Sequence, residues 1–467
     1  MAERMQKFVS VEQAWPDKRP PAERAGDFHE IYAEFIAEKA ADQAGRCAQC
    51  GVPFCQTGCP LHNNIPDWLK LTAEGRLREA YEVSAATNSM PEVCGRICPQ
   101  DRLCEGACVI EQSRHGSVTI GAVEKYLTET AWKEGWVAPI APRAERTESI
   151  GIVGAGPAGL AAAERMRLRG YQVTVYDRHD RVGGLLIYGI PNFKLEKEVI
   201  ERRAQRLIDG GVKFELKCDV GADLSFDDVR RRHDAVLIAT GVYKAKPLNA
   251  PNEQNVAPAL DFLIAANRIG LGDDVPGFTS GALNAKDRRV VVIGGGDTAM
   301  DCVRTARRQG AKSVTCLYRR DRANMPGSQR EVTHAEEEGV LFDWLAAPKA
   351  VRKVGVKAAR MRLGAPDASG RQPPEEAPGG AYDVPGDLVI AALGFDAEDL
   401  SGWNVDLTRW GTVKADPVTY ATSQPGVYAA GDIVRGASLV VWAIREGRDA
   451  ADAMHAWIQS NATVAAE

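Results

Sequence analysis

The chain has 467 residues, of which 45% are hydrophobic and 26% are charged, and its formal net charge is −5. A chain of this length exceeds one ordinary core, so we expect about three domains of a soluble globular protein. The weakly acidic balance gives no reason to expect nucleic-acid binding or a membrane surface. No apolar stretch reaches the roughly 20 residues that cross a bilayer, and no apolar signal core follows Met1, so we expect a cytoplasmic protein.

Eight of the eleven cysteines form two tight groups near the N-terminus. The first group has the spacing C-x2-C-x4-C-x3-C and is followed directly by Pro60. Clustered cysteines in a reducing compartment are more often metal ligands than disulfides. The two groups are Cys47, Cys50, Cys55 and Cys59, and Cys94, Cys98, Cys104 and Cys108.

The first group resembles the bacterial ferredoxin pattern, in which the cysteine before proline binds the other cluster of a pair. We therefore expect the last cysteine of each group to cross to the other cluster. The first [4Fe–4S] cluster is then held by Cys47, Cys50, Cys55 and Cys108. The second is held by Cys59, Cys98, Cys104 and Cys94. Two structural zinc sites are the alternative, because zinc also takes four thiolates.

Apolar residues at i, i+3, i+4 and i+7 spacing predict helices around these cysteines. The predicted helices span 28–37, Ile65–Ala73, Leu77–Thr87 and 121–132. We expect a helical domain of residues 1–145 that ends in a linker rich in proline and charge. The arginines of 201–206 are expected on a solvated helix face.

Residues 149–160 have the pattern of a strand, a tight glycine turn and a helix start. Such a turn presents backbone N–H groups to a pyrophosphate, and glycine allows the phosphate to approach closely. The next strand, 171–176, ends in Asp177, whose carboxylate can bind an adenosine ribose. The turn consists of Gly154, Ala155, Gly156, Pro157, Ala158 and Gly159.

Three later signals indicate that this first nucleotide fold binds FAD. They are a second glycine pair, an A-T-G turn after a buried strand, and an A-G-D turn near the C-terminus. The residues concerned are Gly183, Gly184, Leu185, Thr240, Gly241, Gly431 and Asp432. Leu439 and Trp442 follow the last turn and are expected beside the flavin, with plain helix core as the alternative for Trp442. The predicted FAD domain is therefore interrupted and comprises residues 146–285 and 418–467.

Residues 289–301 repeat the strand–turn–helix pattern, with alanine in place of the third glycine. The next strand, 313–318, ends in Arg319 and Arg320, where a carboxylate would be typical of NAD. Arginines can pair bidentately with a 2′-phosphate, so this domain, 286–417, is predicted to bind NADPH. Within this domain, residues 365–381 are predicted to form a loop, because they are rich in proline, glycine and glutamate. The predicted NADPH residues also include Gly294, Gly295, Gly296, Asp297, Thr298, Ala299 and the closing Gly394.

The whole chain resembles the small (β) subunits of bacterial NADPH-dependent glutamate synthases. The resemblance rests on CAQCGVPFC, GGGDTAMD and AAGD, and most specifically on GGLLIYGIPNFK. It implies an α/β protein in which an N-terminal helical domain with two [4Fe–4S] clusters precedes two Rossmann-like domains. The NADPH domain is inserted in the FAD domain, as in FAD-dependent pyridine nucleotide reductases. The implied partner is a large (α) subunit with FMN, a [3Fe–4S] cluster and a glutaminase site.

The chain is also similar to the N-terminal half of dihydropyrimidine dehydrogenase. In those relatives a glutamine side-chain oxygen replaces one cysteine ligand, and the matching residue here is Glu124. The last ligand of the second cluster is therefore either Cys94 or Glu124.

The resemblance implies that NADPH passes a hydride to FAD and that the clusters carry single electrons to the large subunit. That subunit would convert L-glutamine and 2-oxoglutarate into two L-glutamates. We expect no catalytic acid, base or nucleophile in this chain, because the cofactors carry the chemistry. Two alternatives are a reductase subunit of another iron–sulfur flavoenzyme and a non-catalytic redox sensor with structural metal sites.

Overall fold

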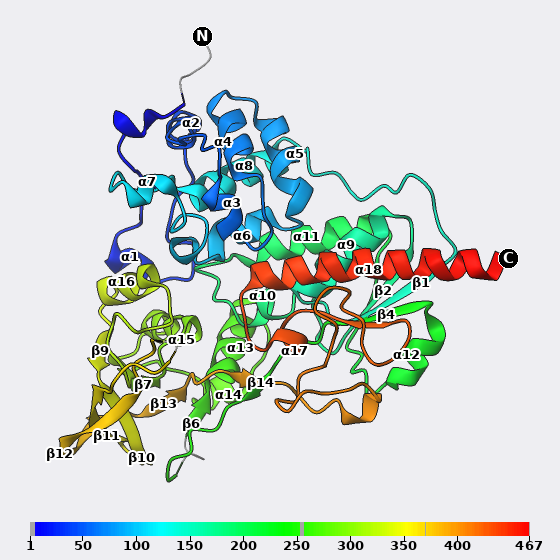
Figure 1. Cartoon of the computed structure of the whole chain (residues 1–467). Coiled ribbons are helices and arrows are strands. Elements are labelled where there is room, and N and C mark those ends of the chain that lie inside the picture. The colour runs from blue at the N-terminus through cyan, green and yellow to red at the C-terminus, as the bar shows by residue number, and fades with distance from the viewer. Residues whose placement is uncertain (1–4, 253–255, 369, 467) are drawn as a thin grey trace.

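The computed structural model describes residues 5–252, 256–368 and 370–466. A helical N-terminal part is followed by two five-stranded parallel sheets, which are covered by helices (Figure 1). This arrangement confirms the predicted class, an α/β protein with a helical domain ahead of two Rossmann-like folds. Within the described ranges, no helix is both long and apolar enough to cross a membrane.

The N-terminal part packs its helices around the buried Trp68, whose indole N–H donates to Asn63 Oδ1 at 2.8 Å. The helices predicted at Ile65–Ala73, Leu77–Thr87 and 121–132 are confirmed. The elements are η1 (Lys7–Val9), α1 (Pro21–Arg24), α2 (Ala37–Gly45), α3 (Phe54–Gly58), α4 (Ile65–Ala73), α5 (Leu77–Thr87), α6 (Pro91–Ile97), η2 (Gln100–Arg102), α7 (Val109–Gln112) and α8 (Ile120–Lys133).

The helix predicted at 28–37 is wrong, because residues 28–36 form an extended arm. Tyr32 makes a β-bridge with Lys18, and its hydroxyl lies 2.9 Å from His334 Nε2 in the second nucleotide fold. The backbone carbonyl of Phe28 accepts a hydrogen bond from Asn192 in the first fold. Contacts with both nucleotide folds therefore override the helical spacing of the apolar residues.

The first sheet has the strand order β15-β4-β1-β2-β3, and all its strands are parallel. The last strand in sequence, β15, completes this sheet beside β4, which confirms that the fold is interrupted and resumes near the C-terminus. Its strands are β1 (Ser149–Val153), β2 (Gln172–Asp177), β3 (Lys213–Leu216), β4 (Ala235–Ile238) and β15 (Val427–Ala429). Its helices are α9 (Pro157–Leu168), α10 (Leu185–Tyr188), α11 (Lys197–Asp209), α12 (Phe226–Arg232), α17 (Asp432–Arg435) and α18 (Val440–Ala466).

The second sheet has the order β6-β13-β7-β8-β9 and is also parallel. Its strands are β6 (Val256–Pro258), β7 (Arg289–Ile293), β8 (Ser313–Tyr318), β9 (Leu341–Trp344) and β13 (Leu388–Ala391). Its helices are α13 (Ala259–Gly270), α14 (Pro276–Thr279), α15 (Asp297–Arg308) and α16 (Gln329–Glu337).

A three-stranded antiparallel sheet extends this second fold. Its last strand, β12 (Pro374–Pro385), pairs with β11 (Gly355–Leu363), which in turn pairs with β10 (Ala346–Arg352). The loop predicted at 365–381 is therefore too long, because the backbone from Pro374 onward forms strand β12. The Pro- and Gly-rich composition of this segment does not predict a strand.

The domain boundaries differ from the predicted ones at 285/286 and 417/418. Strand β6 pairs with β13, and Phe262 of α13 is buried in the core of the second fold. Conversely, Trp403 in η4 (Ser401–Trp403) packs in the first fold and stacks on Phe226 with ring centroids 4.5 Å apart. The chain crosses between the folds at a two-stranded ribbon of β5 (Lys244–Ala245) and β14 (Phe395–Asp396). Sheet pairing thus moves both boundaries to this ribbon.

The arginines of 201–206 are not on a solvated face. Arg203 is 2% exposed, and its guanidinium binds the fully buried Glu92 of α6 at 2.6 and 2.8 Å. Arg202 binds Glu129 of α8 at 2.8 Å. The polar face of α11 is therefore the surface on which the cysteine-bearing domain docks.

Candidate functional site

One cavity is shared by all three parts of the chain. It lies at the carboxyl ends of β1 and β4, where ligands of doubly wound folds bind, and it reaches the start of α15 in the second fold. Cys98 and Asp101 of the cysteine-bearing domain complete its wall. The predicted residues that line it are Gly154, Gly156, Pro157, Ala158, Asp177, Leu185, Thr240, Gly241, Asp297, Thr298, Gly431, Asp432 and Leu439.

The first glycine turn has the geometry that a pyrophosphate site requires. Gly154 has φ 114°, and a Cβ there would lie 2.3 Å from the carbonyl oxygen of Ala239. Gly156 is the N-cap of α9, and a Cβ at this position would meet nothing within 4 Å. The N-terminus of α9 is therefore open to an anion in the cavity.

Asp177 is oriented by the same turn. Its carboxylate accepts from the backbone N–H of Ala155 at 2.7 Å and from that of His179 at 2.8 Å. Asp177 also borders a second cavity of about 470 Å³ beside the central one. The position fits a nucleotide whose ribose binds Asp177 and whose base extends into the second cavity.

Three residues that line this second cavity were not predicted from the sequence. Arg178 lies over the ring of Tyr243 at 4.6 Å and pairs with Glu398 at 2.8 Å. His179 Nε2 is buried without a hydrogen-bond partner among the described residues, and burial lowers the pKa of this imidazole. Only their positions in the sequence could have indicated them. Arg178 and His179 directly follow Asp177, the predicted ribose carboxylate, and Tyr243 lies just after the A-T-G turn.

Of the later FAD signals, the A-T-G and A-G-D turns and Leu439 line the cavity, whereas Trp442 and the second glycine pair do not. The hydroxyl of Thr240 is buried and has no partner in the described part of the chain, as expected of a group that meets a ligand. Burial raises the pKa of Asp432 to about 6. Trp442 does not line the cavity, because its ring lies against the Arg435 guanidinium at 4.2 Å. Val440 and Ala443 of α18 take that place.

Four predicted FAD residues shape the turn and do not line the cavity. Gly183 donates its N–H to the carbonyl of Ala155 at 3.0 Å, and a Cβ on Gly184 would lie 2.9 Å from the Cα of Gly156. The second glycine pair therefore packs directly against the first turn. The four residues are Ala155, Gly159, Gly183 and Gly184.

The second glycine turn repeats this geometry. Gly294 has φ 145°, and a Cβ there would lie 2.2 Å from the carbonyl oxygen of Ala392. Gly296 is the open N-cap of α15. Asp297 accepts from the N–H of Ser328 at 2.9 Å and pairs with Arg102 of the cysteine-bearing domain at 3.1 Å. Around this turn, Gly295 packs against Tyr318, Ala299 is fully buried, and Gly394 has a positive φ of 95°.

Arg319 and Arg320 directly follow β8. Arg319 is exposed, and Arg320 donates from Nε to the Tyr318 hydroxyl at 3.1 Å. Neither guanidinium forms an ion pair with a carboxylate in the described ranges. Their charges are therefore free to meet an external anion.

The eight clustered cysteines surround two small hollows. Cys47, Cys50, Cys55 and Cys108 line one hollow, and the other is lined by Cys59, Cys94, Cys98, Cys104 and Glu124. Ile120 borders both hollows. The structure thus brings Cys108 to the first group and Cys59 to the second, which is the exchange that the ferredoxin-like spacing predicts.

The hollows fit iron–sulfur clusters better than single ions. No three His, Cys, Asp or Glu side chains in the described ranges converge closely enough to hold one metal ion, whereas zinc needs four sulfurs about 2.3 Å from one centre. All eleven cysteines are free thiols. Burial raises the pKa of Cys55 to about 12 and that of Cys59 to about 11. Positive iron would stabilise these buried thiolates.

Glu124 and Cys94 both border the second hollow but differ in their partners. The Glu124 carboxylate accepts from Ser84 Oγ at 3.5 Å and Asn88 Nδ2 at 3.3 Å, and burial raises its pKa to about 8. No ion pair with a basic residue balances this carboxylate in the described part. The Cys94 thiol points at Asn88 Oδ1 at 3.8 Å, and a hydrogen bond with Cys94 raises the pKa of Cys98.

Two nucleotide folds that face one cavity, beside cysteine-lined hollows, define a pyridine nucleotide oxidoreductase fused to an iron–sulfur domain. Residues 24–136 match the family model described as dihydropyrimidine dehydrogenase domain II, 4Fe–4S cluster. Residues 148–447 match the pyridine nucleotide-disulphide oxidoreductase model.

Similar curated proteins identify the family within this class of oxidoreductases. The chain is 61% identical to the glutamate synthase [NADPH] small chain of Azospirillum brasilense, over 98% of both chains. It is 44% identical to the putative oxidoreductase AegA of Escherichia coli (strain K12), over 95% of this chain and 69% of that one. The chain belongs to the family of glutamate synthase [NADPH] small chains.

A solved structure shares the fold of the nucleotide-binding part. It is that of Mycobacterium tuberculosis FprA in complex with NADPH, with a TM-score of 0.58 and 18% identity over 68% of this chain and 86% of that one.

Proposed function

We propose that this chain is the electron-input subunit of a glutamate synthase. It would oxidise NADPH at FAD and pass the electrons through two [4Fe–4S] clusters to a large subunit that carries FMN and a [3Fe–4S] cluster. That subunit would make two L-glutamates from L-glutamine and 2-oxoglutarate. The observation that carries the proposal is the central cavity, where both glycine turns and Cys98 meet. The free thiols also suit the reducing cytoplasm.

The chain's residues would bind and orient the two nucleotides. The 154–159 turn would hold the FAD pyrophosphate, and Asp177 its ribose. The 294–299 turn would hold the pyrophosphate of NADPH, and Arg319 and Arg320 its 2′-phosphate. FAD, when bound, supplies the step between two-electron hydride chemistry and single-electron transfer. The protein itself positions the reactants and excludes water, and no side chain needs to act as acid or base.

The first cluster would be held by Cys47, Cys50, Cys55 and Cys108, and the second by Cys59, Cys98, Cys104 and Glu124. We favour Glu124 over Cys94 because the two side chains differ in their partners. The Cys94 thiol is directed at Asn88 Oδ1, 3.8 Å away. Glu124 instead is a buried carboxylate without a cation, and iron would supply the missing positive charge.

The position of the hollows supports an electron route through the domain. Cys98 borders both the central cavity and the second hollow, and Ile120 separates the second hollow from the first. Beside the first hollow, Val52 and Phe54 are 63% and 50% exposed. We therefore propose that electrons enter the second cluster and leave from the first, at the surface around Val52 and Phe54.

The similarity to AegA favours a second candidate, a reductase module that serves another iron–sulfur flavoenzyme. Anaerobic purification from the native host, followed by an NADPH-oxidation assay, separates the two. Co-purification of a large FMN-containing subunit, with NADPH oxidation that requires both glutamine and 2-oxoglutarate, is the result expected for glutamate synthase. Reduction of artificial acceptors alone, with no effect of those substrates, would assign the chain to the second candidate.

A further inference from the structure

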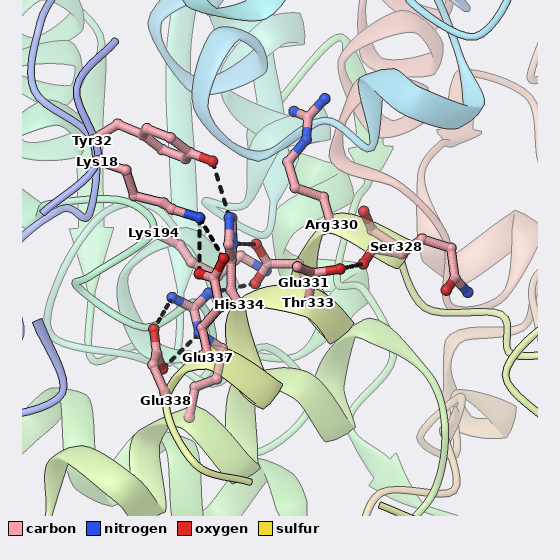
Figure 2. A network of polar contacts seen from close by, with 12 residues as sticks. Lys18, Tyr32, Lys194, Ser328, Arg330, Glu331, Thr333, His334, Glu337 and Glu338 are labelled. Atoms are coloured by element: carbon pink, nitrogen blue, oxygen red, sulfur yellow. Dashed lines mark hydrogen bonds and ion pairs between the residues drawn. The ribbon is translucent and has the colours of Figure 1, made fainter. Parts of the chain in front are cut away.

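The segment that ends in Pro191-Asn192-Phe193-Lys194 lies where all parts of the molecule meet. Asn192 donates to the Phe28 carbonyl of the N-terminal arm at 3.0 Å. Phe193 is 1% exposed and packs under the guanidinium of Arg308 in the second fold, 3.8 Å from its ring centroid. Lys194 Nζ donates to Asp301 Oδ1 at 2.9 Å and lies 3.7 Å from Glu331 Oε2. A residue of the first fold is thus fixed by α15 and α16 of the second (Figure 2).

Lys194 lines the central cavity together with Asp301 and Glu331. Its side chain is only 13% exposed. An ammonium group has three N–H donors, and among the described residues only Asp301 accepts from Lys194 at hydrogen-bond distance. The remaining donors are available to a ligand in the cavity.

The position in the cavity indicates which end of a nucleotide Lys194 meets. Asp177 ends β2 and Arg319 follows β8, so the adenosine ends of FAD and NADPH extend away from the cavity centre. Their reactive rings would meet between the two glycine turns. Asp301 lies one helical turn after Asp297, which places the Lys194 ammonium in this region.

The local charge indicates which chemical group it binds. Asp301 and Glu331 flank the ammonium, so the position has no excess positive charge to attract a phosphate. A neutral oxygen acceptor, such as an amide carbonyl, suits it better. We propose that Lys194 binds the carboxamide oxygen of the NADPH nicotinamide and so orients that ring, an inference that rests on the proposed function.

The test compares two ligands on the FAD-loaded chain: NADP⁺, which carries the carboxamide, and adenosine 2′,5′-bisphosphate, which lacks it. The Lys194→Met variant is expected to bind NADP⁺ about tenfold more weakly or worse, as for the loss of one charged hydrogen bond. Its affinity for the bisphosphate is expected to stay unchanged. The matched control is Lys18→Met, which removes an ion pair to Glu337 on α16 but does not line the cavity. It should leave both affinities unchanged.

Three results would overturn the inference. They are equal weakening of both ligands, unchanged binding of both, and a changed flavin spectrum with unchanged NADP⁺ affinity. If Lys194→Met does not fold, Lys194→Arg retains the charge beside Asp301 but displaces the donors, and the same comparison applies. A native protein that binds neither ligand would instead refute the proposed function itself.

Discussion

Glu338 shows how strongly single residues join the parts of this molecule. Its side chain is fully buried and pairs with Arg308 at 2.6 Å and Arg304 at 2.8 Å. Arg24 of the N-terminal part adds a third guanidinium at 3.3 Å. These arginines hold the pKa of Glu338 at about 2, although burial alone would raise it. Next to it, Lys18 contacts Glu337 of α16, and Tyr32 of the arm contacts His334 of the same helix (Figure 2).

Replacing Glu338 by glutamine is expected to lower stability by about 3–5 kcal/mol near neutral pH, because the buried Arg308 loses its counter-charge and Arg304 keeps only Glu331. The folded pKa lies below the ordinary value of 4.5, so this carboxylate stabilises the fold above about pH 4.5. That contribution is lost as the pH falls from about 4.5 to about 2. Thermal unfolding between pH 7 and 3 should show a shallower pH dependence in Glu338→Gln than in the native protein. Glu336→Gln, at an exposed ion pair on the adjoining helix α16, is the control, and identical slopes in all three proteins would contradict the prediction.

Arg319 and Arg320 set the choice of nucleotide in our proposal. Changing both to alanine is expected to lower kcat/KM for NADPH by about 10- to 100-fold, since charged hydrogen bonds to the 2′-phosphate are lost. Activity with NADH should stay nearly constant, because NADH carries no such phosphate. Arg322→Ala, which loses a pair with Glu336, serves as the control. A parallel loss with NADPH and NADH would show that these arginines act on the fold and not on the phosphate.

At the scale of elements, the close contact of α6 with α8 builds the second hollow. A Cβ on Gly95 of α6 would lie 2.8 Å from the backbone N of Lys125 and 2.9 Å from the carbonyl oxygen of Gly121. This approach brings Glu124 of α8 to the hollow that Cys98 lines. After Cys98, η2 then carries Arg102 to Asp297 of the second glycine turn.

Gly95→Ala is therefore expected to push α8 away and to disrupt the second cluster. Iron per chain should fall to about half of the native amount, since each [4Fe–4S] cluster needs its full set of ligands. The FAD content should not change. Iron analysis and electron paramagnetic resonance of the reduced protein measure this outcome. Gly51→Ala is the control beside the first hollow, where a Cβ meets nothing within 4 Å, and native iron content in Gly95→Ala would refute the argument.

At the scale of the whole molecule, the cysteine-bearing domain is docked on the first fold by buried charge. Arg203 and Glu92 form the central pair, and α18 adds Arg445, which donates to the Pro60 carbonyl at 2.6 Å next to Cys59. The first turns of the long C-terminal helix thus border both the central cavity and the cysteine-bearing domain, and the rest of the helix runs along the first fold to the C-terminus (Figure 1). In our proposal, this docking sets the distance between the flavin and the second cluster.

Arg203→Met is expected to cost about 3–5 kcal/mol, because Glu92 stays buried without its partner. Rapid-mixing absorbance should then show flavin reduction by NADPH at the native rate and slower electron transfer to the clusters. Gln205→Ala, at an exposed position of the same helix, is the control. If both steps slow equally, the pair supports the whole fold and not the docking of the cysteine-bearing domain.

The sequence by itself determined the parts whose chemistry is local. Glycine spacing dictates a turn that only small residues can form, so both nucleotide folds were predictable from 154–159 and 294–299. Cysteine spacing predicted the exchange of Cys59 and Cys108, which the two hollows now show. The position of Arg319 and Arg320 directly after β8 was predictable from the strand pattern, and their contact with a 2′-phosphate stays a prediction.

Only the tertiary structure decided what depends on residues far apart in the chain. The arm at 28–36 has helical spacing but is extended, since its backbone and side chains bind both nucleotide folds. The sequence around Arg203 predicts a solvent-exposed arginine, whereas in the folded chain its guanidinium binds Glu92. The domain boundaries follow strand pairing across the β5–β14 ribbon, and Lys194 becomes a cavity residue only when Asp301 holds it there. Local pattern specifies the type of element and its chemistry, whereas long-range burial and charge pairing specify which surfaces meet.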